Sequence, residues 1–240
     1  MITLNGEKLS DLGFFINLDK RTDRKQKLFE NLNSFNIKGV ERCPARTDNS
    51  TAGINLINTT IDLYKKFLNS NAETLLILED DCQFIEPLNC QSKQILSDIY
   101  SLEWDLFWLG CFNRQKPIYV SNNCYRVTSV SYAQSYIIKK PFAKAVIENV
   151  ESHGFLGGGH LDEILCLLAY SKEVADIPNN LDFYNKQNPL EHFSSQFVSL
   201  CYKYALSTQY NSFSDLWLFD IKLNDFISSS HPEKFLANEE

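Results

Sequence analysis

Three consecutive carboxylates at positions 79–81 follow directly on a run of four aliphatic residues at positions 75–78. An aliphatic run without polar alternation is typical of a strand covered on both faces, and it places the acids at the strand's carboxyl end. Ligands of open α/β sheets bind at that end, and adjacent carboxylates repel one another unless a cation or a proton compensates. The pattern predicts a site for a hard divalent cation, with a solvated acidic turn as the alternative. Hydrophobic residues resume at Cys82, which favours the metal site because the acids then lie between buried segments.

A second acidic pair, Asp162 and Glu163, stands at the start of a predicted helix whose apolar face begins at Leu161. The pair follows Gly157 to Gly159, a run that predicts a mobile loop because glycine adopts many backbone conformations. Carboxylates at a helix amino terminus interact favourably with the helix dipole, so a purely electrostatic role is one interpretation. The other interpretation is that one of these acids takes a proton during a reaction.

A basic stretch, KRTDRKQK at positions 20–27, follows the first apolar run. Thr22 or Asp23 is suited to cap a helix there, which places Arg21 and Arg24 near the helix start. Basic residues at that end oppose the helix dipole, so the pattern favours a negatively charged partner such as a phosphate. A solvated charged face is the alternative interpretation.

The elements that must position these residues alternate along the chain. Hydrophobic runs predict strands, and apolar residues at three- and four-residue intervals predict helices between them. Such alternation predicts an α/β fold with a mainly parallel central sheet flanked by crossover helices. The predicted strands are 12–18, 40–43, 75–79, 104–110, 126–130 and 135–139, and the predicted helices include 53–69, one opened by Pro141, and one near 195–207.

Length and composition restrict the class of protein. The 240 residues suit one large α/β domain, predicted at 1–227, with a polar tail at 228–240. The net charge of −7 disfavours nucleic acid as the main partner, and no apolar segment approaches the length of a transmembrane segment. The amino terminus lacks the pattern of an export signal, and the seven scattered cysteines fit reduced thiols, so we expect a cytoplasmic protein.

Several segments together resemble glycosyltransferase family 25, the lipooligosaccharide and procollagen galactosyltransferase family. The resemblance covers about three quarters of the chain, and it is carried by the order of the segments rather than by one motif. The segments are INLDKRTDRKQKL, LILEDDCQF, WDLFWLG, YIIKKPFAKAV and LDEIL, and the match extends thinly to PNNL at positions 178–181, Gln187 and Ser194-Ser195.

The resemblance implies a Rossmann-like fold of the GT-A type that binds a nucleotide-sugar donor, UDP-linked in our prediction, with Mn²⁺ or Mg²⁺. A sugar diphosphate gains negative charge as it leaves, and a cation held by one or two carboxylates neutralises that charge. Glu79 and Asp81 have acid-any-acid spacing and are the predicted metal ligands, while Asp80 faces a ribose or a neighbour. The other predicted donor contacts are Arg21, Arg24 and Arg46 for the diphosphate and Asn17, Asp19 and Asp48 for base and ribose. His192 and His231 are further metal candidates, although a lone histidine is more often structural.

The family inverts the anomeric carbon, which implies one base that activates an acceptor hydroxyl. We predict Asp162 as this base, because it comes first after the Gly157 to Gly159 loop at a helix start that can face the cleft. Glu163 lies about 100° further around the helix and is predicted to orient the acceptor. The predicted reaction moves a hexose, galactose or glucose, to a saccharide or glycolipid such as lipopolysaccharide core. Contact with a membrane would then be peripheral and made through the acceptor.

Two other classes of protein compete with this prediction. ILEDD is also similar to the acidic pair of phospho-receiver domains, but that pair follows the first strand of the domain, whereas two predicted strands precede it here. The second alternative is a nucleotide-sugar-binding or glycan-binding protein without turnover. It is favoured by Gly53-Ile54 and Ile57-Asn58, which stand where the family commonly has a Gly-Cys and a Ser-His pair.

Overall fold

The computed structural model describes residues 1–48, 51–113, 117–127, 130–153, 160–169 and 197–210, and the backbone of 212–213 and 220–221. The predicted Gly157–Gly159 loop, both metal-candidate histidines and the 228–240 tail lie outside the described residues. The helices are α1 (Thr22–Ser34), α2 (Ala52–Leu68), α3 (Ser92–Ser101), α4 (Lys140–His153) and α5 (Leu161–Ala169). The strands are β1 (Ile2–Leu4), β2 (Glu7–Ser10), β3 (Leu12–Asn17), β4 (Ile37–Lys38), β5 (Glu41–Pro44), β6 (Thr74–Glu79), β7 (Cys82–Phe84), β8 (Leu106–Asn113), β9 (Ile118–Tyr119), β10 (Cys124–Arg126), β11 (Val130–Lys139), β12 (Ser199–Tyr202), β13 (Ser207–Gln209), β14 (Ser212–Phe213) and β15 (Asp220–Ile221).

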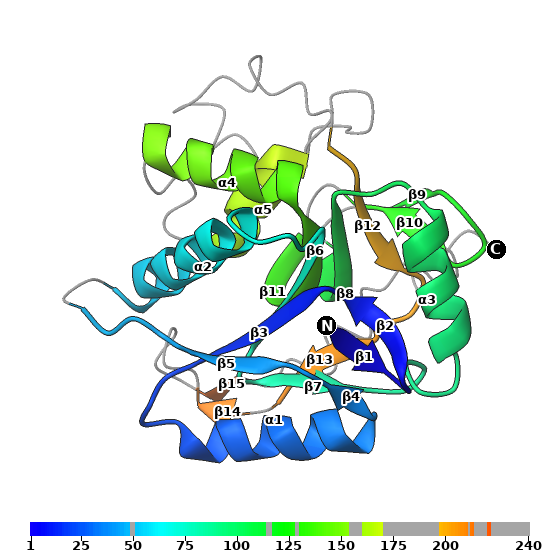
Figure 1. Ribbon diagram of the computed structural model, residues 1–240, viewed down its shortest axis with the longest axis horizontal. Coiled ribbons are helices and arrows are strands. Elements are labelled where there is room, and N and C mark those ends of the chain that lie inside the picture. Colours follow the sequence, from blue (N-terminus) through cyan, green and yellow to red (C-terminus); the bar gives the residue numbers. More distant parts are fainter. Residues whose placement is uncertain are drawn as a thin grey trace.

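An eight-stranded sheet in the order β5-β3-β6-β11-β8-β12-β10-β9 forms the centre of the described structure (Figure 1). Strand β3 pairs in parallel with β5 and β6, and β12 pairs in parallel with β8. Strands β11 and β10 pair antiparallel with both of their neighbours, so six of the eight strands run in one direction. The predicted α/β fold with a mainly parallel sheet flanked by helices is confirmed.

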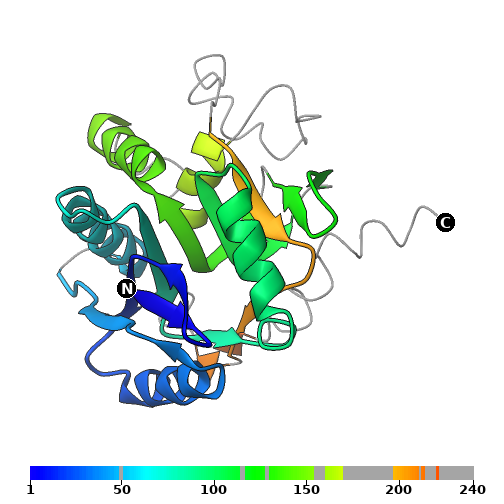
Figure 2. The ribbon, with the colours of Figure 1, turned by 45° about the vertical axis from the view of Figure 1, so that its right-hand side comes forward.

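Helices cover both faces of this sheet (Figures 1 and 2). Successive side chains of a strand point to opposite faces, and accordingly Phe14 joins one hydrophobic cluster while Phe15 joins the other. The first cluster contains apolar residues of α2, α4 and α5, and the second contains those of α1, α3 and the small sheet β2-β1-β4. A strand buried on both faces needs apolar residues at every position, which explains the aliphatic run in β6.

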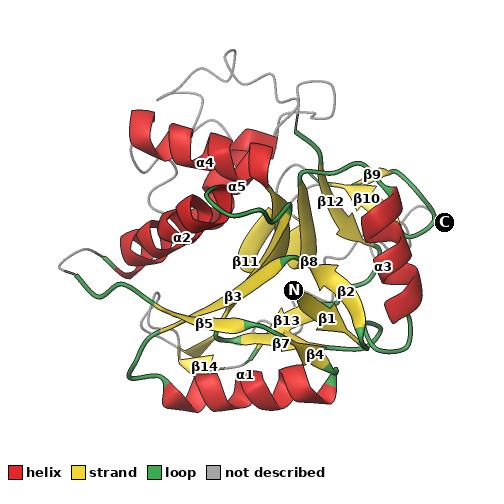
Figure 3. Ribbon diagram, in the orientation of Figure 1, coloured by secondary structure: helices red, strands yellow, loops and turns green. Residues whose placement is uncertain are grey.

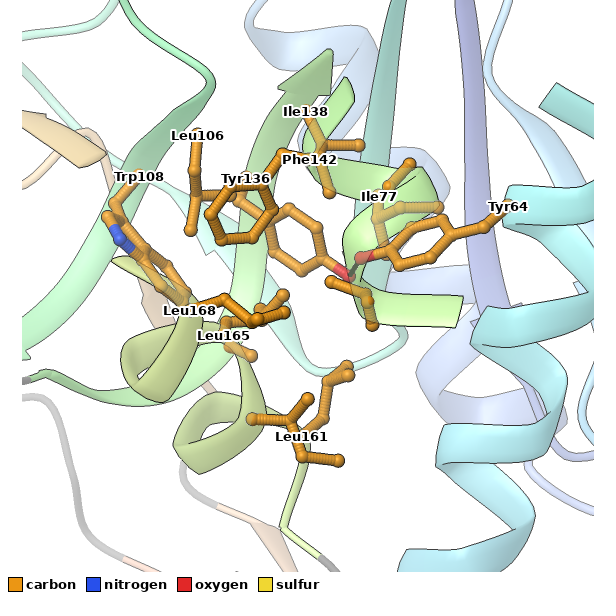
Figure 4. Packing of buried hydrophobic residues seen from close by; sticks show 14 of the residues in the cluster. Tyr64, Ile77, Leu106, Trp108, Tyr136, Ile138, Phe142, Leu161, Leu165 and Leu168 are labelled. Atoms are coloured by element: carbon orange, nitrogen blue, oxygen red, sulfur yellow. Dashed lines mark hydrogen bonds between the residues drawn. The ribbon is translucent and has the colours of Figure 1, made fainter. Parts of the chain in front are cut away.

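The first hydrophobic cluster, between the sheet and helices α2, α4 and α5, includes a polar contact. Tyr64 of α2 and Tyr136 of β11 are fully buried, and their hydroxyl oxygens lie 2.8 Å apart in a hydrogen bond (Figure 4). Leu161, Leu165 and Leu168 of α5 pack beside them. Each hydroxyl therefore has a partner inside the core, and α2 and α5 are both held against the sheet.

The segment after the acids leaves the central sheet at once. Strand β7 pairs antiparallel with β13 in a separate two-stranded sheet, and the short strands are visible among the yellow arrows of Figure 3. Tyr210 N–H, just after β13, donates a 2.8 Å hydrogen bond to the carbonyl of Asp81. The turn between β6 and β7 is thus fixed from outside by β13.

Three sequence predictions of local structure are wrong. The helix expected near 195–207 is replaced by β12 and the start of β13, because Ser199–Tyr202 is completely buried between β8 and β10. The strands expected at 126–130 and 135–139 are divided elsewhere: β10 ends at Arg126, β11 runs from Val130 to Lys139, and the break expected at 131–134 is a bulge within β11. Helix α1 has Arg21 at its N-cap without a side-chain cap, because the carboxylate of Asp23 bonds to the Arg21 guanidinium.

Candidate active site

The predicted acids lie at the point where the strand order of the sheet reverses. The chain passes from β3 to β5 on one side and then returns to β6 on the other side of β3. Ile16 pairs with Glu79, so the carboxyl ends of β3 and β6 lie next to each other, as predicted. Ligands of doubly wound sheets bind outside the strand ends at such a switch point.

Asp80 is held by two side chains from the first strand-helix unit. Asn17, the last residue of β3, donates from Nδ2 to Asp80 Oδ2 at 2.8 Å. Arg24, in the first turn of α1, donates from Nη1 to Asp80 Oδ1 at 2.9 Å. All three residues are buried, so both oxygens of this carboxylate have fixed donors. These partners are side chains of this chain, and a contact of Asp80 with a ribose stays a prediction.

Asp81 shares the same guanidinium but retains an oxygen without a donor. Its Oδ2 lies 3.1 Å from Arg24 Nη1, whereas its Oδ1 is buried and makes no hydrogen bond. A buried carboxylate oxygen without a donor is costly unless a proton or cation contacts it. Asp81 therefore has the chemistry of a ligand for a hard cation.

The electrostatics of the acidic cluster favour an added positive charge. Burial raises the pKa of Glu79 well above its ordinary value, and the charges of Asp81, Asp80 and Asp162 raise it further, against Arg24. Burial also raises the pKa of Asp81 to about 6, although Arg24 opposes the shift. Glu79 and Asp81 thus hold protons more tightly than isolated acids do, because the guanidinium only partly offsets the effects of burial and of the neighbouring charges.

A complete protein metal centre is not formed within the described ranges. No group of three His, Cys, Asp or Glu side chains there has the arrangement of metal ligands. Magnesium and manganese sites that use one or two carboxylates complete their coordination with water and substrate phosphates. The acids at positions 79 and 81 fit such a partial site.

Helix α5 brings the second acidic pair to the same end of the sheet. Asp162 contributes to the raised pKa of Glu79, so the two carboxylates interact electrostatically. Asp162 Oδ2 accepts a 3.0 Å hydrogen bond from Tyr132 N–H, and Oδ1 accepts a 3.0 Å hydrogen bond from Glu163 N–H. Glu163 is half-buried one residue further along the helix.

Among the remaining predicted residues, Arg21 acts on the acidic cluster through its positive charge, which lowers the pKa of Asp81 against the effect of burial. Arg21 bonds to Asp23, and its carbonyl accepts from Asn17 Nδ2 at 3.0 Å. Arg46 pairs with Asp62 of α2, where both side chains are about half exposed. Asp19 and Asp48 are exposed in the loops after β3 and β5. The structure therefore joins Asn17, Arg24 and the acids at positions 80 and 81 into one network, whereas Arg46 pairs outside it with Asp62.

Arg42 is a member of this network that the sequence analysis missed. From β5 it donates through Nε to Asn17 Oδ1 at 2.9 Å and through Nη2 to Asn17 O at 3.2 Å, and it pairs with Asp19. Together with Asp80, these contacts fix the orientation of the Asn17 amide. In the sequence, this residue is a single arginine in the short segment ERCP. Its position beside Asn17 follows only from the pairing of Phe15 with Arg42 between β3 and β5.

No protein-family model and no curated protein sequence matches this chain. The similar solved structures include A197 from STIV, with 15% identity over 55% of this chain and 66% of that one and a TM-score of 0.37. A glycosyltransferase involved in glycosylation of the major capsid of PBCV-1 has 11% identity over 70% of this chain and 78% of that one, with a TM-score of 0.41. A UDP-glucose pyrophosphorylase complexed with UDP-glucose has 10% identity over 91% and 74% of the two chains, with a TM-score of 0.38.

These likenesses are too weak to assign an activity to this chain. The resemblance to glycosyltransferase family 25 has no matching family model and stays a prediction. In the parts of the chain described here, no helix has both the length and the apolar character needed to cross a bilayer.

Proposed function

We propose that this protein is a metal-dependent, inverting glycosyltransferase that moves a hexose from a nucleoside-diphosphate sugar to a hydroxyl acceptor. The observation that carries the proposal is the acidic cluster at the switch point, where the buried Asp81 Oδ1 has no hydrogen-bond donor. The donor is UDP-galactose or UDP-glucose, and the acceptor is a saccharide or glycolipid such as lipopolysaccharide core. The family resemblance, not the geometry, supplies these two identities.

Glu79 and Asp81 would hold Mn²⁺ or Mg²⁺. When bound, the cation neutralises the charge that develops on the leaving diphosphate. Asp80 serves the site differently: it accepts from Asn17 and Arg24 and thereby fixes the turn that carries Asp81. Arg24 keeps both aspartates close together in spite of their mutual repulsion.

Asp162 is the proposed base. The acceptor oxygen attacks the anomeric carbon, the bond from that carbon to the diphosphate oxygen breaks with its electron pair, and the hydroxyl proton passes to Asp162. An ionised carboxylate has about four lone-pair positions. The backbone hydrogen bonds from Tyr132 and Glu163 orient this carboxylate, and base catalysis of this kind contributes about 10²–10⁴-fold. Glu163 orients the acceptor in this proposal.

The remaining proposed contacts with the nucleotide-sugar donor come from residues outside the acidic cluster. Arg21 and Arg46 are proposed to approach the diphosphate by exchanging exposed partners, Asp23 and Asp62, for phosphate oxygens. Asp19 and Asp48 are proposed to contact base and ribose, with Asn17 behind them. The protein is proposed to act in the cytoplasm and to meet a membrane only through its acceptor.

A nucleotide-sugar-binding protein without turnover is the second candidate. It is favoured by the engagement of the Asn17 amide and the Arg24 guanidinium with groups of this same chain. Such a protein would bind a donor in the crevice and release no nucleotide.

A panel of nucleotide sugars separates the candidates. The protein is incubated with each donor, with Mn²⁺, Mg²⁺ or excess chelator, and with saccharide acceptors, and nucleoside diphosphate is measured. Metal-dependent UDP release supports the proposal. Calorimetric binding without UDP release supports the second candidate, and formation of a nucleotide sugar from sugar phosphate and nucleoside triphosphate would indicate a nucleotidyltransferase instead.

A further inference from the structure

Helix α5 is fastened to strand β11 at two points that lie one helical turn apart. At the first, Asp162 Oδ2 accepts from Tyr132 N–H at 3.0 Å. At the second, Cys166 Sγ accepts from Val130 N–H at 3.2 Å and donates to Val130 C=O at 3.3 Å. Residues four apart share one face of a helix, so a single polar edge of α5 serves the backbone from Val130 to Tyr132.

This part of β11 needs partners because it extends beyond the acidic strand. β6 pairs with β11 only from Ser135 to Lys139, and the register with β8 shifts between Ser131 and Ser135. Tyr132 has a positive φ of 69° inside this bulge. Bulges near functional sites redirect groups of the backbone, and buried N–H and C=O groups require partners. The carboxylate and the thiol of α5 take the place of a neighbouring strand.

The same strand also sets the relation of α5 to the acidic cluster. Ser135 of β11 pairs with Leu78, next to Glu79, so the bulge begins where the predicted metal ligands begin. The apolar edge of α5 packs through Leu161, Leu165 and Leu168 against the core around Tyr136 (Figure 4). The helix is therefore fixed on one edge by packing and on the other by the two contacts to β11.

We propose that Cys166, together with the backbone of Val130 and of Tyr132 in the β11 bulge, forms a positioning clamp that orients Asp162 toward the acidic strand. This inference rests on the proposed function, because it assumes that Asp162 is the base. Cys166 is a positioning residue that acts through the helix and does not contact the substrate. The fixed tilt of α5 determines which lone pairs of Asp162 face the acceptor.

The variant Cys166→Ala tests the clamp through kinetics. A misplacement of about 1 Å can lower a rate by about 10²-fold, so we expect kcat to fall by at least about tenfold while donor Kd stays within about twofold. Cys166→Ser should recover part of the loss, because a hydroxyl also donates and accepts. The matched control is Cys90→Ala at an exposed thiol, which should retain the kcat of the unmodified protein.

Amide hydrogen exchange tests the clamp independently of turnover. In Cys166→Ala, the amides of Val130 and Tyr132 should exchange at least about tenfold faster, whereas Ile137 and Ile138 of the same strand should be unchanged. Unchanged exchange at Val130 and Tyr132 overturns the inference, and so does faster exchange with an unchanged kcat. If the unmodified protein transfers no sugar from any donor, the proposed function fails, while exchange still decides whether the clamp exists.

Discussion

Replacement of Arg24 by methionine should destabilise the fold far more than removal of an exposed arginine. Arg24 contacts Asp80 at 2.9 Å and Asp81 at 3.1 Å, and these side chains are 9%, 10% and 14% exposed. Methionine fills similar space but leaves the buried carboxylate of Asp80 and the largely buried carboxylate of Asp81 without their cation. Removal of one partner from a buried ion pair costs about 3–5 kcal/mol. We expect the free energy of unfolding at pH 8, measured in urea with a chelator, to fall by an amount in this range.

The same variant should recover stability in acid. Without Arg24, the pKa of Asp81 should rise above its present value of about 6. The folded state then binds a proton that the unfolded state lacks between about pH 4 and that raised pKa, so stability increases as pH falls through this window. The control is Arg46→Met, whose pair with Asp62 is about half exposed and should contribute about 0–1 kcal/mol. A loss in Arg24→Met as small as in the control, and equal at pH 5 and pH 8, would refute the reasoning.

Three further predictions concern the acids and the sheet. Asp162→Asn should lower kcat by at least about 10²-fold with little change in donor affinity, because the amide keeps the shape and loses the basicity; near-native turnover in this variant together with loss in Glu163→Gln would reverse the two roles. The stability of Asp81→Asn relative to the unmodified protein should increase by about 1 kcal/mol in urea titrations as the pH is raised from about 5 to about 7.5. The Asp81 carboxyl, with its pKa of about 6, loses its proton in this window and the unmodified protein loses stability, whereas the amide does not titrate; an equal difference at both pH values contradicts the burial of this charge. Gly110→Ala should destabilise the protein by at least about 1–3 kcal/mol, because a Cβ there would overlap the backbone carbonyl of Ser207, and a thermal midpoint equal to that of the unmodified protein would contradict this packing.

The sheet centre and the main acidic cluster were predictable because burial on both faces requires an unusual sequence. Leu75 to Leu78 have no polar alternation. Few structures other than a strand buried on both faces fit such a run when charged residues follow it directly. Alternation of strands and helices also predicted that β3 and β6 would be parallel, and their register brings Ile16 opposite Glu79. The placement of the acids at the carboxyl end of β6 followed from these two features.

The partners of the acids were not predictable in the same way, since they depend on register. Arg42 contacts Asn17 because β5 pairs with β3, and a single arginine in a four-residue strand gives no sign of this. The interruption at 131–134 was expected, but the bulge contains no glycine, although Tyr132 has a positive φ, so the sequence did not show that the strand continues through it. Ser199–Tyr202 is a strand because β8 and β10 flank it, and these contacts override its local pattern.

Transfer of a hexose from UDP-galactose or UDP-glucose in the presence and absence of Mn²⁺ tests the central claim most directly. The unmodified protein and Asp81→Ala are compared at pH 7.5 by release of UDP, with circular dichroism to verify that the variant is folded. The proposed function predicts UDP release that requires the cation and that is lost in the folded variant. Full turnover of the unmodified protein in excess chelator, or undiminished metal-dependent turnover in Asp81→Ala, would contradict it.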